Sequence, residues 1–285
     1  MSETRVKVGI RMRPEMASST MKGFSLRESE GMMEMTVGNQ PHQFKFDHVL
    51  SPTASQETVF NSCAAGICDK VLEGFNGCIF AYGQTGAGKT YTMTGPASSD
   101  SYVDRGICMR TASHFFAHAA RLPPNESISI RLSVLEIYNE TLTDLLRESP
   151  SPPMALASTI PPAPKLTIVD TPAGVVVPSL YVLPLSSEED ALSMLMEADS
   201  NRVVAEHQLN RSSSRSHVVY TFYITRTKER VLSQNQGHQA NPRNHHQSGG
   251  GHNSSSSSSS SSDPEVIQVS SDSIFFNALL PLNGS

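Results

Sequence analysis

The fold of this chain is decided by one short stretch, Cys78-Ile79-Phe80-Ala81-Tyr82-Gly83-Gln84-Thr85-Gly86-Ala87-Gly88-Lys89-Thr90. Its first five residues form an apolar run of the length typical of a buried strand. The eight residues from Gly83 to Thr90 then match the pattern G-x-x-x-x-G-K-[ST] of a phosphate-binding loop. Because a strand directly precedes the loop, as this motif requires, a chance match in a glycine-rich turn is the weaker interpretation. The stretch predicts a nucleoside triphosphate site.

The residue types in this loop each have a chemical reason. Its three glycines permit backbone angles that a side chain would forbid, so successive N–H groups can point at phosphate oxygens. Lys89 places a positive charge near the outer phosphates, and the Thr90 hydroxyl can ligate Mg²⁺. We expect a helix to begin around Tyr91, with its positive end facing the same anion. The expected nucleotide ligands in this loop are Gly83, Gln84, Thr85, Gly86, Ala87, Gly88, Lys89 and Thr90.

Length and composition favour one large domain, or one domain with a tail. The chain has 285 residues and a formal net charge of −5, which argues against general nucleic-acid binding. The cysteines lie in predicted helix and strand interiors without metal-ligand spacing, which is typical of reduced core residues in an intracellular protein. No apolar run is long enough to span a membrane, so we expect no membrane partner. The cysteines are Cys63, Cys68, Cys78 and Cys108.

Local patterns predict alternating strands and helices up to about residue 230, where the composition changes. The tail is rich in Gln, Asn, His, Gly and Ser and cannot bury enough surface to offset its ordering entropy. We therefore predict a domain over 1–230 and a disordered tail over 231–285. Residues 148–164, rich in Pro and Ser, are expected to form a surface loop. Strands are expected at 6–10, 32–37, 43–46, 78–82, 127–137, 166–169, 175–177 and 218–225, and helices at 55–72, 106–122, 142–146 and 187–198.

A second diagnostic stretch is Asn210-Arg211-Ser212-Ser213-Ser214-Arg215-Ser216-His217. Alone it is a polar loop or a phosphorylation site. Downstream of the phosphate loop it matches N-x-x-S-S-R-S-H, the signature of the kinesin motor domain. The chain resembles that family from about Arg5 to about Thr227, and its closest likeness is to the kinesin-9 family, which is associated with cilia and flagella. Arg11-Met12-Arg13-Pro14, Leu135-Glu136-Ile137-Tyr138-Asn139-Glu140 and Asn201-Arg202 agree with it.

The resemblance implies an α/β P-loop fold in which helices flank an eight-stranded central sheet. It also implies an ATPase that uses Mg²⁺ and moves along microtubules, located in the cytoplasm on the cytoskeleton or in a ciliary or flagellar axoneme. Its site residues fall into three groups. Arg11 and Pro14, with Tyr91, would border the adenine; Lys89 and Thr90 would hold the phosphates and Mg²⁺; Ser213, Ser214 and Arg215 belong to the switch I loop that closes on the γ-phosphate, where Ser214 would be a second Mg²⁺ ligand.

The chain departs from the family after Thr227. The switch II run D-L-A-G-S-E occurs nowhere in it, and no track-binding helix, final strand or coiled-coil heptad repeat is recognisable. Two functions remain: a microtubule motor, and a non-motile truncated fragment that binds nucleotide without productive ATPase activity or strong microtubule binding. A P-loop kinase or GTPase is disfavoured because no N-K-x-D run is present. The strand at Cys78 would lie between two lost strands, so we expect unpaired edges there.

Overall fold

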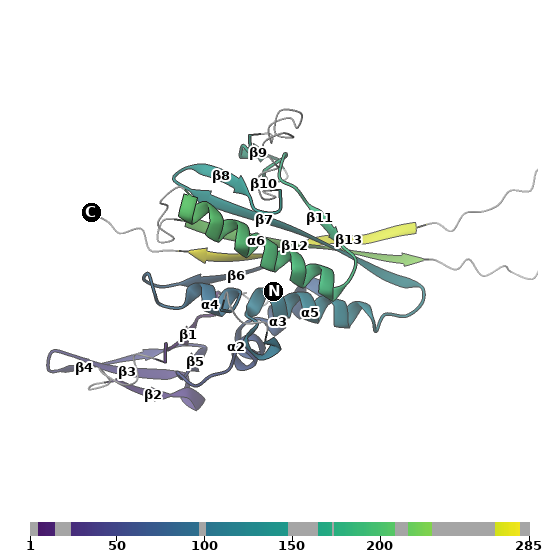
Figure 1. The fold of residues 1–285 in the computed structure, drawn as a ribbon. Helices are drawn as coiled ribbons and strands as arrows, with labels where there is room; N and C mark the ends of the chain where they lie inside the picture. Colours follow the sequence, from purple (N-terminus) through teal and green to yellow (C-terminus); the bar gives the residue numbers. More distant parts are fainter. Residues whose placement is uncertain are drawn as a thin grey trace, which may run out of the picture.

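The structure is a computed structural model that describes residues 5–14, 24–96, 101–147, 165–172, 174–208, 216–229 and 266–279. Its centre is a six-stranded sheet (Figure 1). The strands follow the order β11 (Leu183–Leu185), β7 (Glu126–Tyr138), β12 (Ser216–Glu229), β13 (Val266–Leu279) and β6 (Gly77–Tyr82), and β8 (Thr141–Asp144) pairs with β7. β13 runs antiparallel to β12 and parallel to β6.

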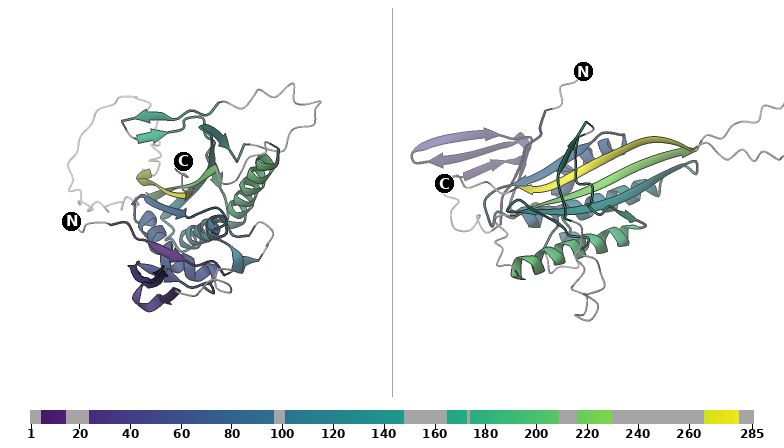
Figure 2. Two further views of the ribbon diagram at one scale, coloured as in Figure 1. Left: turned by 90° about the vertical axis from the view of Figure 1, so that its left-hand side faces the viewer. Right: turned by 90° about the horizontal axis from the view of Figure 1, so that it is seen from above.

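The described helices cover one face of this sheet (Figure 2). They are α2 (Gln56–Cys63), α3 (Ala65–Leu72), α4 (Lys89–Met93), α5 (Ile107–Ala119) and α6 (Glu188–Gln208), with 3-10 turns η1 (Glu28–Glu30) and η2 (Tyr102–Asp104). Phe115 of α5 and Phe222 of β12 are both fully buried and meet edge to face, with ring centroids 5.9 Å apart. On β6 the burial alternates: Ile79 faces the core, whereas Phe80 and Tyr82 are 51% and 70% exposed. The core therefore lies between the helices and one side of the sheet.

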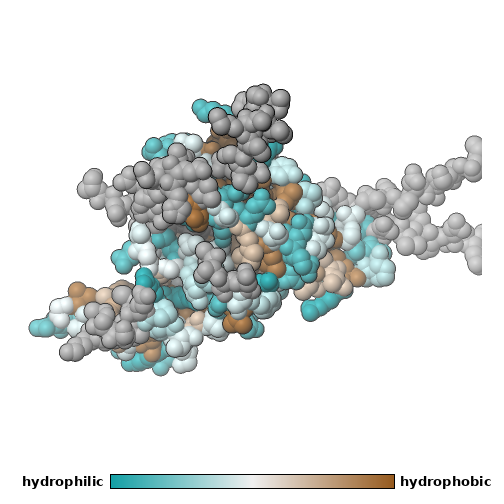
Figure 3. Space-filling view, in the orientation of Figure 1, coloured by the Kyte–Doolittle hydropathy of each residue, from teal (hydrophilic) through white to brown (hydrophobic). Residues whose placement is uncertain are grey.

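Three smaller sheets surround the centre. β1 (Gly9–Arg11) pairs in parallel with β5 (His48–Leu50). An antiparallel sheet of β2 (Phe24–Arg27), β3 (Met32–Val37) and β4 (Gln40–Lys45) projects from the body at lower left in Figures 1 and 3. β9 (Val169–Thr171) and β10 (Gly174–Val176) form a hairpin. No helix in the described part of the chain is long and apolar enough to cross a membrane.

Most predicted elements are present, but two helix predictions need correction. The helix expected over 55–72 begins as predicted, since the Ser55 hydroxyl accepts from the Thr58 N–H at 3.0 Å, yet it breaks at Ala64. The helix expected over 142–146 is wrong. Asn139 and Glu140 both have positive φ, +46° and +62°, which is the backbone of a tight two-residue hairpin turn. That turn pairs Thr141 with Tyr138 and makes the following residues a strand, β8.

The expectation of a disordered tail is wrong for residues 266–279, which form β13. This segment finds backbone partners on both sides, because β12 and β6 each offer an open edge. One edge of β6 is therefore paired, against our expectation, while no described strand pairs with its other edge. The central sheet has six described strands rather than eight. The rest of the tail, and the loop expected over 148–164, lie outside the described residues.

Candidate functional site

The loop between β6 and α4 has the backbone that a phosphate cradle requires. Gly83, Gly86 and Gly88 adopt φ values of +157°, +78° and +92°, a region that residues with a side chain rarely enter. Gly88 occupies the N-cap position of α4. Because α4 is only five residues long, the cradle depends on the loop geometry more than on a long helix dipole. The remaining expected ligands in this loop, Gln84, Thr85 and Ala87, are exposed.

Lys89 lies across the mouth of this loop. Its ammonium group donates hydrogen bonds to the carbonyl oxygens of Gly83 and Gln84, each at 2.8 Å. Burial lowers the pKa of Lys89, and the nearby positive charge of Arg202 lowers it further. The ammonium group of Lys89, held at the loop by two carbonyl oxygens, makes the site favourable for an anion. Thr90, the next residue, is exposed.

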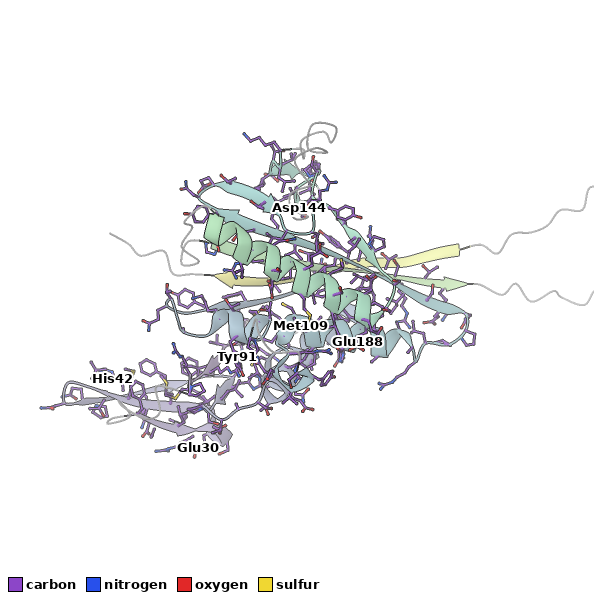
Figure 4. The ribbon with its side chains drawn as sticks, in the orientation of Figure 1. Glu30, His42, Tyr91, Met109, Asp144 and Glu188 are labelled. Atoms are coloured by element: carbon purple, nitrogen blue, oxygen red, sulfur yellow. The ribbon has the colours of Figure 1, made fainter. Side chains whose placement is uncertain are left out.

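The structure brings two of the three predicted adenine-border residues together. The Arg11 guanidinium carbon lies 5.1 Å from the centre of the Tyr91 ring, within cation–π range. Figure 4 shows Tyr91 on α4, with Asp144 on the other side of α6. Arg11 is half-buried, and burial lowers its pKa. Pro14, the third residue, is exposed at the edge of the described segment.

Sequence reasoning missed three residues that support this border. The Arg11 Nη1 donates to Gln56 Oε1 at 2.9 Å and to Thr92 Oγ1 at 3.0 Å. Arg13 donates from its own Nη1 to the Gly86 carbonyl oxygen, tying the segment after β1 to the phosphate loop. Arg13 lies inside the quoted stretch Arg11–Pro14 and Thr92 lies two residues after the phosphate loop, whereas Gln56 begins a helix remote from both in sequence. The only sequence signal for its position was the predicted start of a helix at residue 55.

The predicted switch I residues Ser213, Ser214 and Arg215 lie outside the described residues, so the structure does not place them. Ser216, which follows them directly, begins β12 and is buried. Its hydroxyl accepts from Nη2 of Arg202 at 3.2 Å. The Arg202 Nε also lies 3.7 Å from the buried carboxylate of Glu136 on β7. Arg202 therefore anchors the C-terminal end of the predicted switch loop to the sheet.

A buried polar group lies behind the phosphate loop. The Tyr220 hydroxyl on β12 donates to Asp199 on α6. Burial raises the pKa of Asp199, while bonds from Tyr220 and Thr94 partly oppose that rise. Thr94 is the C-cap of α4. The end of the phosphate-loop helix, α6 and β12 are therefore joined through one carboxylate.

A resident metal site built from protein side chains is not seen in the part of the chain that the structure describes, where no group of His, Cys, Asp and Glu could hold a metal ion. The donor set fits a different arrangement. The hydroxyl of Thr90 beside a phosphate cradle is a suitable ligand for Mg²⁺, which takes few protein ligands and binds mainly to phosphate oxygens and water. The second expected ligand, Ser214, lies outside the described residues.

Comparisons with known proteins agree on one relationship. The family model described as Kinesin motor domain matches residues 11–243. Kinesin-like protein KIF9 of Homo sapiens is 42% identical over 193 residues, which cover 68% of this chain and 23% of that protein. Kinesin-like protein KLP1 of Chlamydomonas reinhardtii is 36% identical over 233 residues, covering 79% of this chain and 28% of that protein. The chain thus spans about a quarter of the length of these relatives.

The fold has a counterpart among solved structures. The chain superposes on the protein reported under "Structure of a fast kinesin: Implications for ATPase mechanism and interactions with microtubules" with a TM-score of 0.72. The two are 24% identical, and the alignment covers 98% of this chain and 68% of the solved one. At that identity the match shows the fold alone, and it confirms the predicted α/β motor architecture.

Proposed function

Because this chain belongs to the kinesin motor domain family, we propose that it binds ATP with Mg²⁺ at the loop Gly83–Thr90. Kinesin motor domains are microtubule-stimulated ATPases, and that class of activity is the one to test here. The observation that carries the proposal is the loop itself. Three glycines in left-handed or extended positive-φ backbone surround a lysine whose ammonium group is held at the loop mouth by two carbonyl oxygens.

The chain's own residues divide the work of binding. Lys89 would leave the carbonyls of Gly83 and Gln84 to meet the outer phosphates, exchanging two neutral acceptors for charged ones. Arg11 and Tyr91 would present a flat surface to the adenine, with Pro14 beyond them. Mg²⁺, when bound, would neutralise phosphate charge, and the hydroxyls of Thr90 and Ser214 would hold it. Ser213 and Arg215 would position the γ-phosphate side of the site, because phosphoryl transfer depends mainly on positioning and charge stabilisation.

A second candidate function is a non-motile nucleotide-binding fragment, and one observation favours it. β13 occupies the position beside both β12 and the phosphate-loop strand β6. Neither β13 nor any other part of the chain carries the D-L-A-G-S-E run through which the family senses the γ-phosphate. Nucleotide could therefore bind without driving turnover.

Two further proposals concern the binding partner of the chain and its location in the cell. Microtubules are the proposed partner because of the family, and the cytoskeleton is the proposed location. A ciliary or flagellar axoneme rests on the kinesin-9 likeness alone, which the similarity to KIF9 supports.

The Mg²⁺ dependence of binding tests the proposal. A fluorescent ATP analogue should bind the wild-type chain about tenfold more tightly with Mg²⁺ than with EDTA, because metal and phosphate bind as a unit. Thr90→Ala should lose most of that response. Thr36→Ala, an exposed threonine on β3, is the matched control and should keep it. Equal Mg²⁺ responses in the wild type and Thr90→Ala, or no binding by the wild type, would contradict the proposal.

A further inference from the structure

We propose that Gln56 is a positioning residue that sets the platform for the nucleotide base, and thereby controls the base-dependent share of affinity. The inference rests on the proposed nucleotide binding, which it deepens. Gln56 belongs to no nucleotide motif in the sequence. The structure nevertheless buries it to 3% exposure directly behind the Arg11–Tyr91 pair.

The position of Gln56 is determined by the start of α2. It is the first residue of that helix, and Ser55 caps the helix by accepting from the Thr58 N–H at 3.0 Å. The cap holds the entry of the chain into α2, so the Gln56 side chain leaves the helix from a defined point. That point faces the segment between α4 and α5.

The carboxamide of Gln56 uses both of its donors and its acceptor. Its Nε2 donates to the Tyr91 carbonyl oxygen at 2.6 Å and to the Asp104 carbonyl oxygen at 3.1 Å. Its Oε1 accepts from Arg11 Nη1 at 2.9 Å. One buried side chain therefore joins β1, α4 and the loop that leads into α5.

The bond to Tyr91 meets a need of the short helix α4. The last carbonyls of a helix have no intrahelical donor. α4 ends at Met93, and the Gly95 N–H returns to the Thr90 carbonyl rather than to that of Tyr91. Gln56 supplies the donor that the Tyr91 carbonyl would otherwise take from the next turn.

The hydrogen bond between Gln56 and Arg11 also affects Tyr91, through its ring. The guanidinium group is held by Gln56, by Thr92 Oγ1 at 3.0 Å and more weakly by the Ala54 carbonyl oxygen at 3.4 Å. In that position it lies over the Tyr91 ring, and Tyr91 as a whole is 41% exposed. Gln56 thus holds Tyr91 through its backbone directly and through its ring by way of Arg11.

Only an amide satisfies these three neighbours together. Arginine supplies a donor and needs an acceptor, whereas the two carbonyls need donors. A glutamate would keep the Arg11 contact but place a carboxylate against two carbonyl oxygens. A methionine of similar length would leave all three groups without this partner.

The phosphates offer a way to separate positioning from general stability. They would contact residues 83–90, and within the described structure Gln56 makes no hydrogen bond to any of these. Its nearest bond is to the carbonyl oxygen of Tyr91, the residue that follows the loop. A defect at Gln56 should therefore weaken binding of a nucleotide but spare binding of a base-free polyphosphate. A merely structural defect would weaken both by the same factor.

The experiment compares Mg-ATP with Mg-tripolyphosphate in competition against a fluorescent ATP analogue. Gln56→Met should bind ATP about five- to tenfold more weakly than the wild type, because the Arg11 cation is no longer oriented and its hydrogen bonds are lost. Its affinity for tripolyphosphate should stay within about twofold of the wild type. Gln56→Glu should lose less ATP affinity than Gln56→Met, because a glutamate keeps the contact with Arg11. Gln43→Met is the matched control, because Gln43 is an exposed glutamine on β4 that donates to Glu34 of β3 at 2.7 Å.

The combination with Arg11→Ala shows whether Gln56 acts through Arg11. The ATP affinity of the double variant Gln56→Met/Arg11→Ala should lie within about twofold of that of Arg11→Ala alone. The inference is overturned if Gln56→Met loses ATP and tripolyphosphate equally, or loses neither, or if the two substitutions multiply. A wild type that binds tripolyphosphate but shows no preference for ATP would overturn the base platform alone. One that binds neither would overturn the proposed function with it.

Discussion

Arg202 on α6 and Glu136 on β7 form a buried ion pair, with Nε 3.7 Å from Oε1 and the Glu136 side chain only 1% exposed. This contact is wider than a hydrogen bond, but Arg202 also donates to Ser216 at 3.2 Å. The pair therefore ties α6 to two neighbouring strands, at the point where the predicted switch I loop joins β12. It is the most deeply buried charge pair among those described.

Breaking this pair from one side should be costly. Arg202→Met takes a cation away from the buried Glu136 carboxylate, so the free energy of unfolding should fall by about 3–5 kcal/mol. Urea denaturation measures it. Arg27→Met is the control, since Arg27 pairs with Glu34 at an exposed site and should cost about 1 kcal/mol or less. The double variant Arg202→Met/Glu136→Leu should recover much of the loss; a double variant as unstable as Arg202→Met would show that the pair is not the cause.

The tail strand should be necessary for a folded phosphate loop. Phe276 of β13 lies between Tyr220 of β12 and Ile79 of β6 in the ladder. Proline there removes a ladder donor from a central strand, and domains hold only roughly 5–15 kcal/mol in reserve. Phe276→Pro should therefore abolish the cooperative thermal transition seen by near-UV circular dichroism. Ser256→Pro, in the serine run, should leave it unchanged; an unaltered transition in Phe276→Pro would mean that β6 does not depend on β13.

The half-buried carboxylate of Asp199 should make stability depend on pH. Burial raises its pKa above the ordinary 3.8, so the folded state binds this proton more tightly than the unfolded chain does. Its contribution is then greatest at low pH and declines as pH rises through the raised folded pKa. Asp199→Asn removes that decline, so its stability relative to wild type should rise with pH from about 4 upward. Urea midpoints across pH measure it, with the exposed Asp170→Asn as control. A constant difference between wild type and Asp199→Asn would contradict the assignment.

Turnover should be weak even where nucleotide binds. The chain lacks D-L-A-G-S-E, so we expect little or no stimulation of its ATPase activity by microtubules. A steady-state phosphate-release assay with and without microtubules measures it. Grafting that switch and the remaining motor elements after Thr227 should restore stimulation, and Arg215→Ala should then be harmful only in the graft. Stimulation of the ungrafted chain to the level of an intact motor domain would show that switch II is dispensable here.

The sequence was informative where function constrains a contiguous motif. The strand before Gly83, the glycine positions and the cap at Ser55 were all predictable, because each depends on neighbours in the chain. The helix predicted over 142–146 failed because a turn two residues earlier decided the outcome. Positive φ at Asn139 and Glu140 returns the chain against β7, and pairing there overrides the local helix pattern.

The remaining errors concern distant partners. Gln56 acquires its role from Arg11, Tyr91 and Asp104, up to 48 residues away, which no local pattern reports. The strand β13 likewise depends on open edges supplied by β12 and β6, from across a polar stretch that reads as a tail. The switch I residues remain predictions, since they lie outside the described residues.

The central claim is that Lys89 and the loop around it bind the phosphates of ATP, and one measurement tests it most directly. Titration of the purified chain with a fluorescent Mg-ATP analogue should give saturable binding that Lys89→Ala weakens more than tenfold, the effect of losing a charge-assisted contact of about 1.5–3 kcal/mol. Lys45→Ala, an exposed lysine on β4, should bind as the wild type does. Equal affinity for the analogue in the wild type and Lys89→Ala would contradict the account.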